Sequence, residues 1–192
     1  NLGRILSAGN HLLSLINEVL DLSAIESDKL DLYFDDVSVF SSIGYAENLL
    51  EHKAKEQNVR IINKVSPEQD SFVYADGTRF RQVLLNLLSN AIKYNKEGGS
   101  VIIEIEKNAP GIVRLRISDT GSGIPLDKQK NLFTPFDRLG AESKAIEGTG
   151  IGLTISKRLI KKMGGDIELE SSTVQGSCFI VQLPEGKNVT SE

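Results

Sequence analysis

The first part of the chain carries an apolar pattern of helical period. Between residues 2 and 25, apolar side chains recur at spacings of three and four, which predicts one long amphipathic helix. Adjacent positions are filled together at Leu12 with Leu13 and at Leu15 with Ile16, so the stripe is wider than the seam of a two-stranded coiled coil. Such a face is typical of a helical bundle whose other helices come from a second chain or from sequence outside these residues. Packing against the domain that follows is the alternative interpretation.

Beyond Ser27 the pattern changes to short alternating or β-branched runs. These runs predict strands at residues 30–39, 59–65, 100–107, 112–119, 166–171 and 177–183. Helical patterns lie between them, at residues 40–57, 76–94 and 151–163. Asp76 is placed to cap the second helix, and Gly164-Gly165 to end the third. The elements lack the regular alternation of a doubly wound sheet, so we expect an α+β fold in which helices cover one face of the sheet.

Composition limits the classes of partner. The chain has 192 residues, enough for one domain with an appended element, and 26 acidic residues against 22 basic ones give a net charge of -4. A chain with this charge balance lacks the electropositive surface with which proteins bind nucleic acid or anionic membranes, so we expect neither partner. The early uncharged run, residues 5–17, is too short for a membrane span or a signal peptide. Cys178 is the only cysteine, which excludes an internal disulfide and favours a reducing compartment.

The helix predicted from Asp76 has a polar stripe opposite its apolar side. The stripe consists of Arg79, Gln82, Asn86, Ser89, Asn90 and Lys93. A solvent-facing surface is the simplest interpretation, but asparagines are weaker helix formers than the Lys or Glu usual on such surfaces. The alternative is a nucleotide site, because an asparagine oxygen can join the shell of a phosphate-held Mg²⁺ ion and Lys93 can contact a phosphate oxygen. Tyr94, at the border of the stripe, is either half-buried or stacked on a base.

A predicted strand ends in Asp119, followed closely by Gly121 and Gly123 and then by Ile124. A tight turn with flexible residues explains this segment taken by itself. In the functional interpretation, the Asp119 carboxylate accepts a hydrogen bond from an exocyclic amine, while the glycines let the backbone approach a ligand. Adenine offers such an amine, whereas guanine presents a carbonyl oxygen that a carboxylate repels. If it binds a base, the segment therefore selects adenine.

A glycine-rich segment opens the last predicted helix, at Glu147-Gly148-Thr149-Gly150-Ile151-Gly152-Leu153. Glycines at a helix start expose amide groups to phosphate oxygens, and the helix dipole adds to the attraction. The segment lacks the Lys-Ser/Thr ending of a Walker loop and the spacing of a dinucleotide fingerprint, so both of those folds are disfavoured. Upstream, Phe133 and Phe136 are expected in the core. Arg138 lies at the root of a polar segment, residues 137–147, that we expect to form a lid, and from there it can reach a terminal phosphate.

Taken in order, these segments resemble the sequence boxes of sensor histidine kinases. The resemblance is carried by residues 86–94, 119–124, 133–138, 148–153 and 176–184, and by residues 2–26, which look like the second helix of the family's dimerisation and phosphoacceptor domain. It implies a two-layer α/β sandwich of the Bergerat (GHKL ATPase) type, with a mixed sheet covered by helices on one face and preceded by one long bundle-forming helix. The implied domains are residues 1–29, part of the dimerisation domain, residues 30–187, the catalytic ATP-binding domain, and residues 188–192, a tail.

This resemblance implies that the chain binds ATP with Mg²⁺. Asn90 is implied as the Mg²⁺ ligand, Tyr94 as a neighbour of adenine and Asp119 as the reader of its amine. Lys93 and Arg138 are implied as the catalytic residues that contact phosphates, because phosphoryl transfer depends mainly on positioning and charge neutralisation. The implied nucleotide-binding set as a whole is Asn86, Asn90, Lys93, Tyr94, Asp119, Gly121, Gly123, Ile124, Arg138, Gly148, Thr149, Gly150, Ile151, Gly152 and Leu153, with Ser177 on the adenine side.

The implied activity is that of an ATP-dependent protein-histidine kinase. By the resemblance, the γ-phosphate passes to a histidine in the phosphoacceptor domain of the same protein, and then to an aspartate in the receiver domain of a response regulator. The full protein is expected to form a homodimer through its helical bundle and to act in the cytoplasm, with or without a membrane anchor elsewhere. No membrane contact is expected from the present residues.

Two departures from the related patterns bear on the reaction. Related chaperones, topoisomerases and mismatch-repair ATPases have a water-activating glutamate where this chain has Asn86, and because an amide is a poor base, transfer is favoured over hydrolysis. The family's acceptor histidine is followed by an acid, but Leu12 follows His11 and Lys53 follows His52. We therefore expect the acceptor before residue 1, and no autophosphorylation by these residues alone. A nucleotide-binding module without kinase activity is the alternative, while a Bergerat ATPase or a serine kinase is disfavoured.

Overall fold

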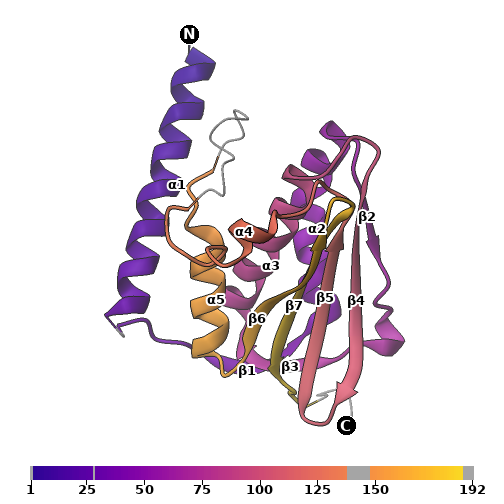
Figure 1. Cartoon of the computed structure of the whole chain (residues 1–192). Helices are drawn as coiled ribbons and strands as arrows, with labels where there is room; N and C mark the ends of the chain where they lie inside the picture. The colour runs from indigo at the N-terminus through magenta and orange to yellow at the C-terminus, as the bar shows by residue number, and fades with distance from the viewer. Residues whose placement is uncertain (1, 28, 138–147, 188–192) are drawn as a thin grey trace.

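The computed structural model describes residues 2–27, 29–137 and 148–187 (Figure 1). Its helices are α1 (Leu2–Glu26), α2 (Val39–Glu56), α3 (Gly77–Lys93), α4 (Leu126–Gln129) and α5 (Gly152–Lys162), with a 3-10 turn η1 at Pro67–Gln69. Its strands are β1 (Phe34–Ser38), β2 (Arg60–Asn63), β3 (Phe72–Asp76), β4 (Ser100–Ala109), β5 (Ile112–Asp119), β6 (Asp166–Thr173) and β7 (Gly176–Pro184). Helices α2, α3 and α5 cover one face of the main sheet, and α1 stands beside α5 (Figure 1).

The main sheet has five strands in the order β2-β4-β5-β7-β6. The β2–β4 pair is parallel and the other pairs are antiparallel, so the sheet is mixed. A separate antiparallel pair, β1 with β3, is joined to the end of β7 by a bridge between Val73 and Glu185. The expected α+β sandwich, with a mixed sheet and helices on one face, is therefore confirmed.

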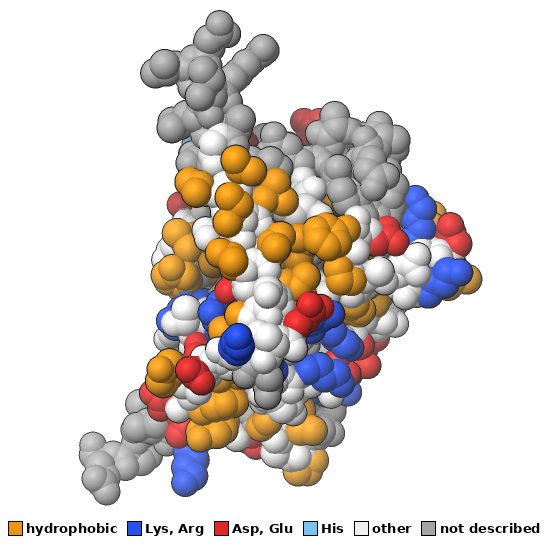
Figure 2. Space-filling view, turned by 90° about the vertical axis from the view of Figure 1, so that its left-hand side faces the viewer, with side chains coloured by type: hydrophobic (Ala, Val, Ile, Leu, Met, Phe, Trp, Pro, Cys, Tyr) orange, Lys and Arg blue, Asp and Glu red, His pale blue; other side chains and the backbone are white. Residues whose placement is uncertain are grey.

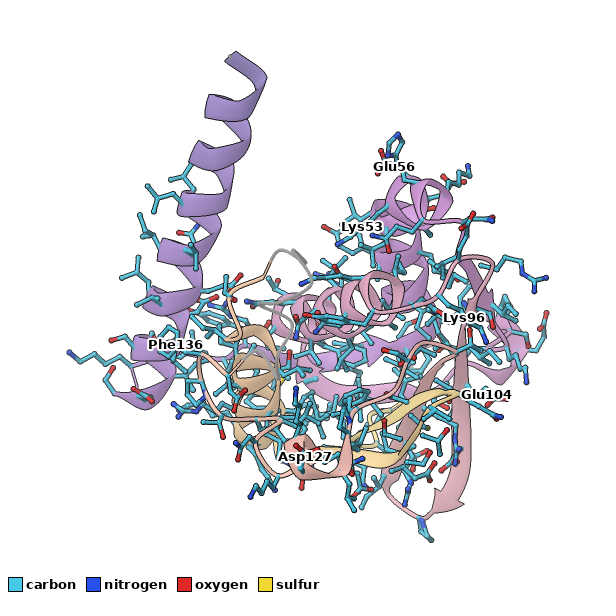
Figure 3. The ribbon with its side chains drawn as sticks, turned by 45° about the horizontal axis from the view of Figure 1, so that its top comes forward. Lys53, Glu56, Lys96, Glu104, Asp127 and Phe136 are labelled. Atoms are coloured by element: carbon cyan, nitrogen blue, oxygen red, sulfur yellow. The ribbon has the colours of Figure 1, made fainter. Side chains whose placement is uncertain are left out.

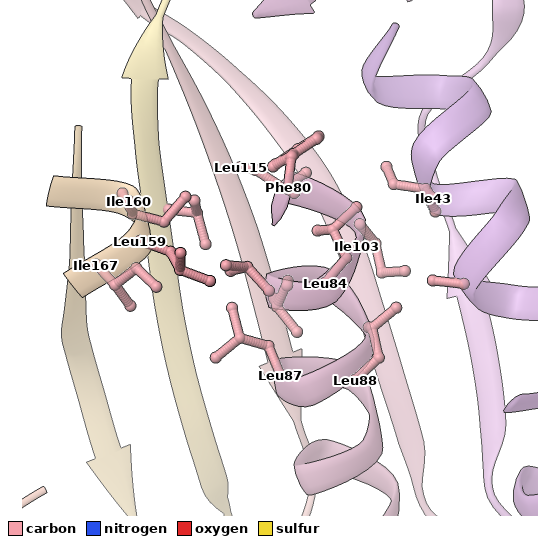
Figure 4. Packing of buried hydrophobic residues seen from close by; sticks show 14 of the residues in the cluster. Ile43, Phe80, Leu84, Leu87, Leu88, Ile103, Leu115, Leu159, Ile160 and Ile167 are labelled. Atoms are coloured by element: carbon pink, nitrogen blue, oxygen red, sulfur yellow. The ribbon is translucent and has the colours of Figure 1, made fainter. Parts of the chain in front are cut away.

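Helix α3 lies at the centre of the core. Its apolar side presents Phe80, Leu84, Leu87 and Leu88, all nearly or fully buried, in the spacing that one helix face requires. Figure 4 shows these side chains between the sheet, α2 and α5. Their partners include Ile43 of α2, Ile103 and Leu115 of the sheet, and Leu159 and Ile160 of α5. Truncation of such a side chain to alanine typically costs about 2–5 kcal/mol. These contacts therefore hold α3 firmly against the sheet and against helices α2 and α5.

The opposite face of the sheet carries a ladder of charges. Arg116 pairs with Glu106 on β4 and, through its Nη1 atom, with Glu170 Oε2 on β6 at 2.8 Å. Arg114, two residues earlier on β5, lies 3.3 Å from Glu106 Oε2 through its Nε atom. The aliphatic parts of such side chains can shield apolar neighbours, and Ile180 on β7 is fully buried. This network makes the helix-free face polar.

Asp76 ends β3 and caps α3, as the sequence predicts. Its Oδ1 accepts hydrogen bonds from the backbone N–H groups of Thr78 and Arg79, both at 3.0 Å, and its Oδ2 accepts one from Tyr33 N at 3.0 Å. Burial by itself raises the pKa of this carboxyl, but the three amide donors outweigh burial and the pKa is lowered overall. The first turn of α3 is thereby fixed to the segment that leads into β1.

Most predicted elements agree with the structure to within a residue or two, but the segment 30–39 does not. Residues 30–33 are not in a strand, and Val39 begins α2 because Ser38 caps that helix by accepting a hydrogen bond from Ser41 N. Strand β3 was not predicted, since its five residues run directly into the helix cap and their strand pairing comes from the distant β1. The short helix α4 was not predicted either.

The apolar stripe of α1 is buried against the domain at one end of the helix and exposed further along it. At its C-terminal end Leu22 and Ile25 are buried against the domain. Further up the helix, apolar side chains remain 45–61% exposed and gather along its surface (Figure 2), namely Leu12, Leu13, Ile16, Val19 and Leu20. Helix α1 therefore docks by its lower end and leaves an apolar face exposed above. In the described ranges, none of the helices has the length and apolar character needed to cross a membrane.

Candidate functional site

The polar stripe of α3 serves two different purposes along its length. Near the start of the helix, Arg79 and Gln82 bind Asp21 of α1, with Arg79 Nη1 at 3.2 Å from Asp21 Oδ1 and Gln82 Nε2 at 2.9 Å from Asp21 Oδ2. Ser89 accepts a hydrogen bond from Lys53 Nζ of α2 at 2.8 Å. The stripe is therefore not one surface, and the candidate site residues on it are Asn86, Asn90 and Lys93.

Asn86 joins α3 to α5 and orients the next asparagine. Its Nδ2 donates to Ser156 Oγ at 2.8 Å, and its Oδ1 accepts from Asn90 Nδ2 at 3.4 Å. Because the Asn90 amide nitrogen turns toward Asn86, the Asn90 carbonyl oxygen is directed away from it. A β-carbon at Gly152 would lie 2.4 Å from Asn86 Oδ1, so only glycine lets α5 begin this close to α3. The arrangement leaves a neutral oxygen on Asn90 that suits a hard cation.

Lys93 lies one turn further along α3, beside the glycine segment. Its ammonium nitrogen is 4.7 Å from the centre of the Tyr94 ring, which is 38% exposed. A β-carbon at Gly148 would lie 2.6 Å from the same nitrogen, so the end of α3 and the start of the glycine segment are in contact. The chain thus places a cation where the glycine segment begins.

The glycine segment is a turn that leads into α5. Gly150 has a φ of 74°, a conformation that side chains other than glycine rarely adopt, and its carbonyl accepts a hydrogen bond from Phe136 N at 3.0 Å. Thr149 Oγ1 accepts from Ile151 N at 3.2 Å, and Ile151 is fully buried. Leu153 also packs against the core. These contacts anchor the helix end of the segment.

Asp119 lies at the end of β5 with its carboxylate held by the backbone. Its Oδ1 accepts hydrogen bonds from Gly121 N at 2.8 Å and from Ser177 N at 3.3 Å. Burial raises the pKa of this carboxyl above its ordinary value, and the two amide donors offset only part of that rise. Ser177 acts here through its backbone, while its side chain shares a hydrogen bond with Ser172 Oγ at 3.0 Å. The second oxygen of Asp119 makes no hydrogen bond within the described residues, so a ligand can use it.

The two glycines after Asp119 are required by packing within the chain itself. A β-carbon at Gly121 would lie 2.4 Å from the carbonyl oxygen of Tyr94. One at Gly123, where φ is 67°, would lie 1.7 Å from the carbonyl oxygen of Thr173. Ile124 N donates to Ser172 Oγ at 2.6 Å. The segment 119–124 is therefore wedged between the end of α3 and the β6–β7 turn.

Sequence reasoning missed the contacts that α1 makes with this region. Glu18 accepts a hydrogen bond from Thr149 Oγ1 of the glycine segment, and Glu26 pairs with Arg158 of α5. The signal was present in the spacing, because the acids of α1 and its two buried apolar residues share one helix face, at positions 18, 21, 22, 25 and 26. The first helix is thus in direct contact with a predicted phosphate-binding residue.

Some residues named in the sequence analysis lie outside the part of the chain that the structure describes, and one lies where it was not expected. Arg138, Glu147 and the expected lid up to Glu147 lie outside the described residues, as does the side chain of His11. Phe133 packs against the core as predicted, but the prediction for Phe136 is wrong. Phe136 has a φ of 65°, is 62% exposed and lies on the side of the domain nearest α1 (Figure 3). Its left-handed backbone, bound to the glycine segment, turns its ring away from the core.

Three segments are thus brought together around the end of α3, namely the helix end with Asn90 and Lys93, the turn after Asp119, and the glycine segment. Asn90 supplies a neutral oxygen, Lys93 a cation and Asp119 a partly buried carboxylate with one oxygen available. These are the groups that a metal-bound, phosphate-bearing ligand with an exocyclic amine would need. The site therefore has the chemistry of an adenine nucleotide site.

Comparison with known proteins also gives a class of protein that uses ATP. Residues 75–187, more than half of the chain, match the family model described as histidine kinase-, DNA gyrase B- and HSP90-like ATPase. The chain therefore belongs to this ATPase family, and curated relatives that it matches are named as histidine kinases.

Two curated relatives illustrate the extent of the match. An uncharacterised sensor-like histidine kinase of Rhizobium meliloti is 35% identical over 96% of this chain, which corresponds to 35% of that protein. The circadian input-output histidine kinase CikA of Synechococcus elongatus is 37% identical over 93% of this chain and 24% of that protein. The chain thus spans about a third or less of the length of these relatives.

Solved structures have the same fold. Full-length ShkA in complex with AMPPNP superposes with a TM-score of 0.80 at 30% identity, over 95% of this chain and 37% of that chain. Histidine kinase ThkA in complex with the response regulator protein TrrA gives a TM-score of 0.73 at 29% identity, over 95% of this chain and 49% of that chain. Both similarities include α1 as well as the catalytic domain, because they cover nearly the whole chain.

Proposed function

We propose that the chain binds Mg²⁺-ATP and serves as the catalytic region of a sensor histidine kinase. Its γ-phosphate acceptor would be a histidine outside these residues, and the phosphate would then pass to an aspartate of a response regulator. The observation that carries the proposal is the meeting of Asn90, Lys93 and Asp119 around one helix end, with the glycine segment alongside. The AMPPNP complex of ShkA and the TrrA complex of ThkA are consistent with both parts of the proposal.

Each residue has a task that follows from its chemistry. Asp119 accepts a hydrogen bond from the adenine amine through the oxygen that the backbone leaves available, and Tyr94 lies against the base. Asn90 offers its oxygen to Mg²⁺, which, when bound, neutralises charge on the phosphates. Lys93 and, from the undescribed segment, Arg138 bind phosphate oxygens. The turn at Gly148, Thr149, Gly150, Ile151, Gly152 and Leu153 covers the phosphates, and its amides face them except that of Ile151, which Thr149 Oγ1 binds.

Asn86 favours phosphoryl transfer over hydrolysis. Its amide is already committed to Ser156 and Asn90, and an amide cannot take a proton from water at neutral pH. Because no base activates water from this position, ATP is preserved for an external acceptor.

The proposed organisation extends beyond the nucleotide site. Residues 1–29 would belong to a dimerisation and phosphoacceptor domain, residues 30–187 to the catalytic domain and residues 188–192 to a tail. The exposed apolar face of α1 supports a bundle with further helices of the same protein and of a second copy. We place this activity in the cytoplasm, where ATP is available.

Two measurements test the proposal. Calorimetric titration with ATP in the presence of Mg²⁺ should give saturable binding of one nucleotide per chain, with GTP binding more weakly. Mixing this chain with a separate phosphoacceptor-domain fragment and γ-labelled ATP should then label a histidine of that fragment. Saturable binding without labelling in any pairing would favour a nucleotide-binding module, and an absence of binding at millimolar ATP would reject the site altogether.

A further inference from the structure

We propose that Asn95 and Thr120 form a positioning pair that fixes the Tyr94 ring relative to the Asp119 carboxylate and so sets adenine selectivity. This inference rests on the proposed function, because it concerns the same nucleotide site. Neither residue would contact the base. Each one directly follows a residue that would, since Asn95 comes after Tyr94 and Thr120 after Asp119.

Asn95 joins the end of α3 to the start of β4. Its Nδ2 donates to Ala91 O and to Ser100 O, both at 3.0 Å, so it satisfies a carbonyl in the last turn of the helix and another on the neighbouring strand. Its Oδ1 accepts from Lys96 N at 3.0 Å and from Thr120 Oγ1 at 3.0 Å. The amide therefore uses both donors and both acceptor positions, which holds it in one orientation.

Thr120 completes the connection from β5. Its hydroxyl donates to Asn95 Oδ1 and accepts from Ser100 N at 2.9 Å, while its own backbone N–H donates to Ser100 O at 3.1 Å. Three separate elements, the helix end and the two strand ends, thus meet in one hydrogen-bonded group. A β-carbon at Gly99 would lie 2.1 Å from Asn95 Oδ1 and 2.8 Å from Thr120 Oγ1, so the group is packed tightly from that side as well.

The group controls geometry because it joins the helix end that carries Tyr94 to the strand end that carries Asp119. Tyr94 is the C-terminal cap residue of α3 and is partly exposed, and terminal turns open more readily than helix interiors. Its carbonyl oxygen lies against Gly121, whose N–H binds the Asp119 carboxylate. A shift of the helix end would therefore move the ring and the carboxylate apart. Interactions that recognise a base amine are steeply distance-dependent, so a small shift would weaken adenine binding more than phosphate binding.

The test replaces the threonine hydroxyl by a methyl group of similar size. Thr120→Val should weaken ATP binding about tenfold, which equals 1.4 kcal/mol. Binding of GTP, which cannot use Asp119 in the same way, should change little, so the ratio of the GTP and ATP dissociation constants should fall about tenfold. Thr120→Ser, which retains the hydroxyl, should restore both affinity and ratio. In the nucleotide-free protein, hydrogen exchange at the Gly121 amide should be faster in Thr120→Val than in the wild type, and unchanged in Thr120→Ser.

A double-mutant cycle and a matched control separate positioning from general stability. Asn95→Ala, at a half-buried position, should weaken ATP binding to the same extent, and the double variant should bind no more weakly than either single variant, because the pair acts as a unit. Ser42→Ala removes a buried hydroxyl that donates to Ser38 O at 2.8 Å on α2, at a position that is not among the proposed site residues, and should leave ATP affinity and nucleotide selectivity unchanged.

The outcomes distinguish this inference from the proposed function. If Thr120→Val lowers the melting temperature but keeps the wild-type affinity and nucleotide ratio, the pair is merely structural and the inference fails. Additive losses in the double variant would also overturn it. If Thr120→Val does not fold, the Asn95→Ala affinity and ratio decide the question. Lack of ATP binding by the wild-type chain would instead reject the proposed function itself.

Discussion

The two ends of the proposed nucleotide site are built in different ways. At the base end, Asp119 is held by two backbone amides, that of Gly121 in the following turn and that of Ser177 on β7, and the turn is packed between α3 and the β6–β7 turn. At the phosphate end, the glycine segment touches Lys93 of α3 but also binds Glu18 of α1 through Thr149. The proposed base end is thus formed within residues 30–187, whereas the proposed phosphate end also contacts α1. Base recognition should therefore be insensitive to α1, and phosphate binding should respond to it.

The largest expected effect comes from removing the charge at the base end. Asp119→Asn should weaken ATP binding by about 1.5–3 kcal/mol, roughly ten- to more than a hundredfold, because a charged acceptor of the amine is lost. The asparagine oxygen can still accept from Gly121 N and Ser177 N, so the fold should be kept. Because burial raises the pKa of Asp119, the ionised carboxylate costs stability at neutral pH, and the variant should melt at the same temperature or higher. Calorimetry and thermal melts measure the two effects.

The pH profile provides the control for this variant. The folded-state pKa of Asp119 lies above its unfolded value, so protonation stabilises the fold as pH falls through the folded pKa, while the same protonation removes the amine acceptor. As the pH is lowered, wild-type ATP affinity should therefore begin to fall at a higher pH than it would if Asp119 had the ordinary pKa of an aspartate. Asp119→Asn should lack this step. An affinity equal to that of the wild type at neutral pH would contradict the role of Asp119.

An intermediate effect is expected at the junction of the two ends, where we propose that Asn90 binds Mg²⁺. Asn90→Ala should weaken binding of ATP about tenfold with Mg²⁺ present and much less with a chelator, because only the metal-dependent part uses the Asn90 oxygen. Ser89→Ala, the neighbouring residue on α3, removes a contact with Lys53 instead and should leave the magnesium dependence intact. Titrations with and without chelator test both variants, and an equal loss under the two conditions would remove Asn90 from the metal shell.

The sequence predicts the base end better than the phosphate end for a physical reason. The helix from Asp76, the strand ending at Asp119 and the glycines that follow are local patterns, and the structure keeps them where periodicity places them. The contact between Glu18 and Thr149 joins residues far apart in the chain, so the spacing of acids along one face of α1 indicates a contact face but does not identify Thr149 as its partner. Strand β3 was missed for the same reason, since its partner is the distant β1.

Phe136 illustrates a different limit. Its aromatic ring favours a core position in any reading based on composition, yet its left-handed backbone and its hydrogen bond to Gly150 leave it exposed. A positive φ at a non-glycine residue is set by the surrounding structure rather than by the residue itself. Likewise, Arg79 and Gln82 share a polar stripe with Asn90, but only the tertiary contact with Asp21 reveals that they serve to dock α1.

The smallest expected effect tests the phosphate end directly. Glu18→Gln retains an oxygen that can accept from Thr149 but removes a negative charge beside the expected phosphates, so ATP binding should strengthen by less than about 1 kcal/mol, or roughly two- to fivefold. Added salt should shrink the difference, because screening weakens the repulsion in the wild type.

The matched control is Glu26→Gln, which removes the charge that pairs with Arg158 at the other end of the docked region. If α1 influences the phosphates only through the charge of Glu18, this control should leave ATP affinity unchanged. An equal gain in both variants would mean that loosening α1 as a whole, rather than local repulsion, governs the phosphate end. The ATP-to-adenosine affinity ratio then separates the two ends of the site, since only the nucleotide with phosphates should respond to Glu18.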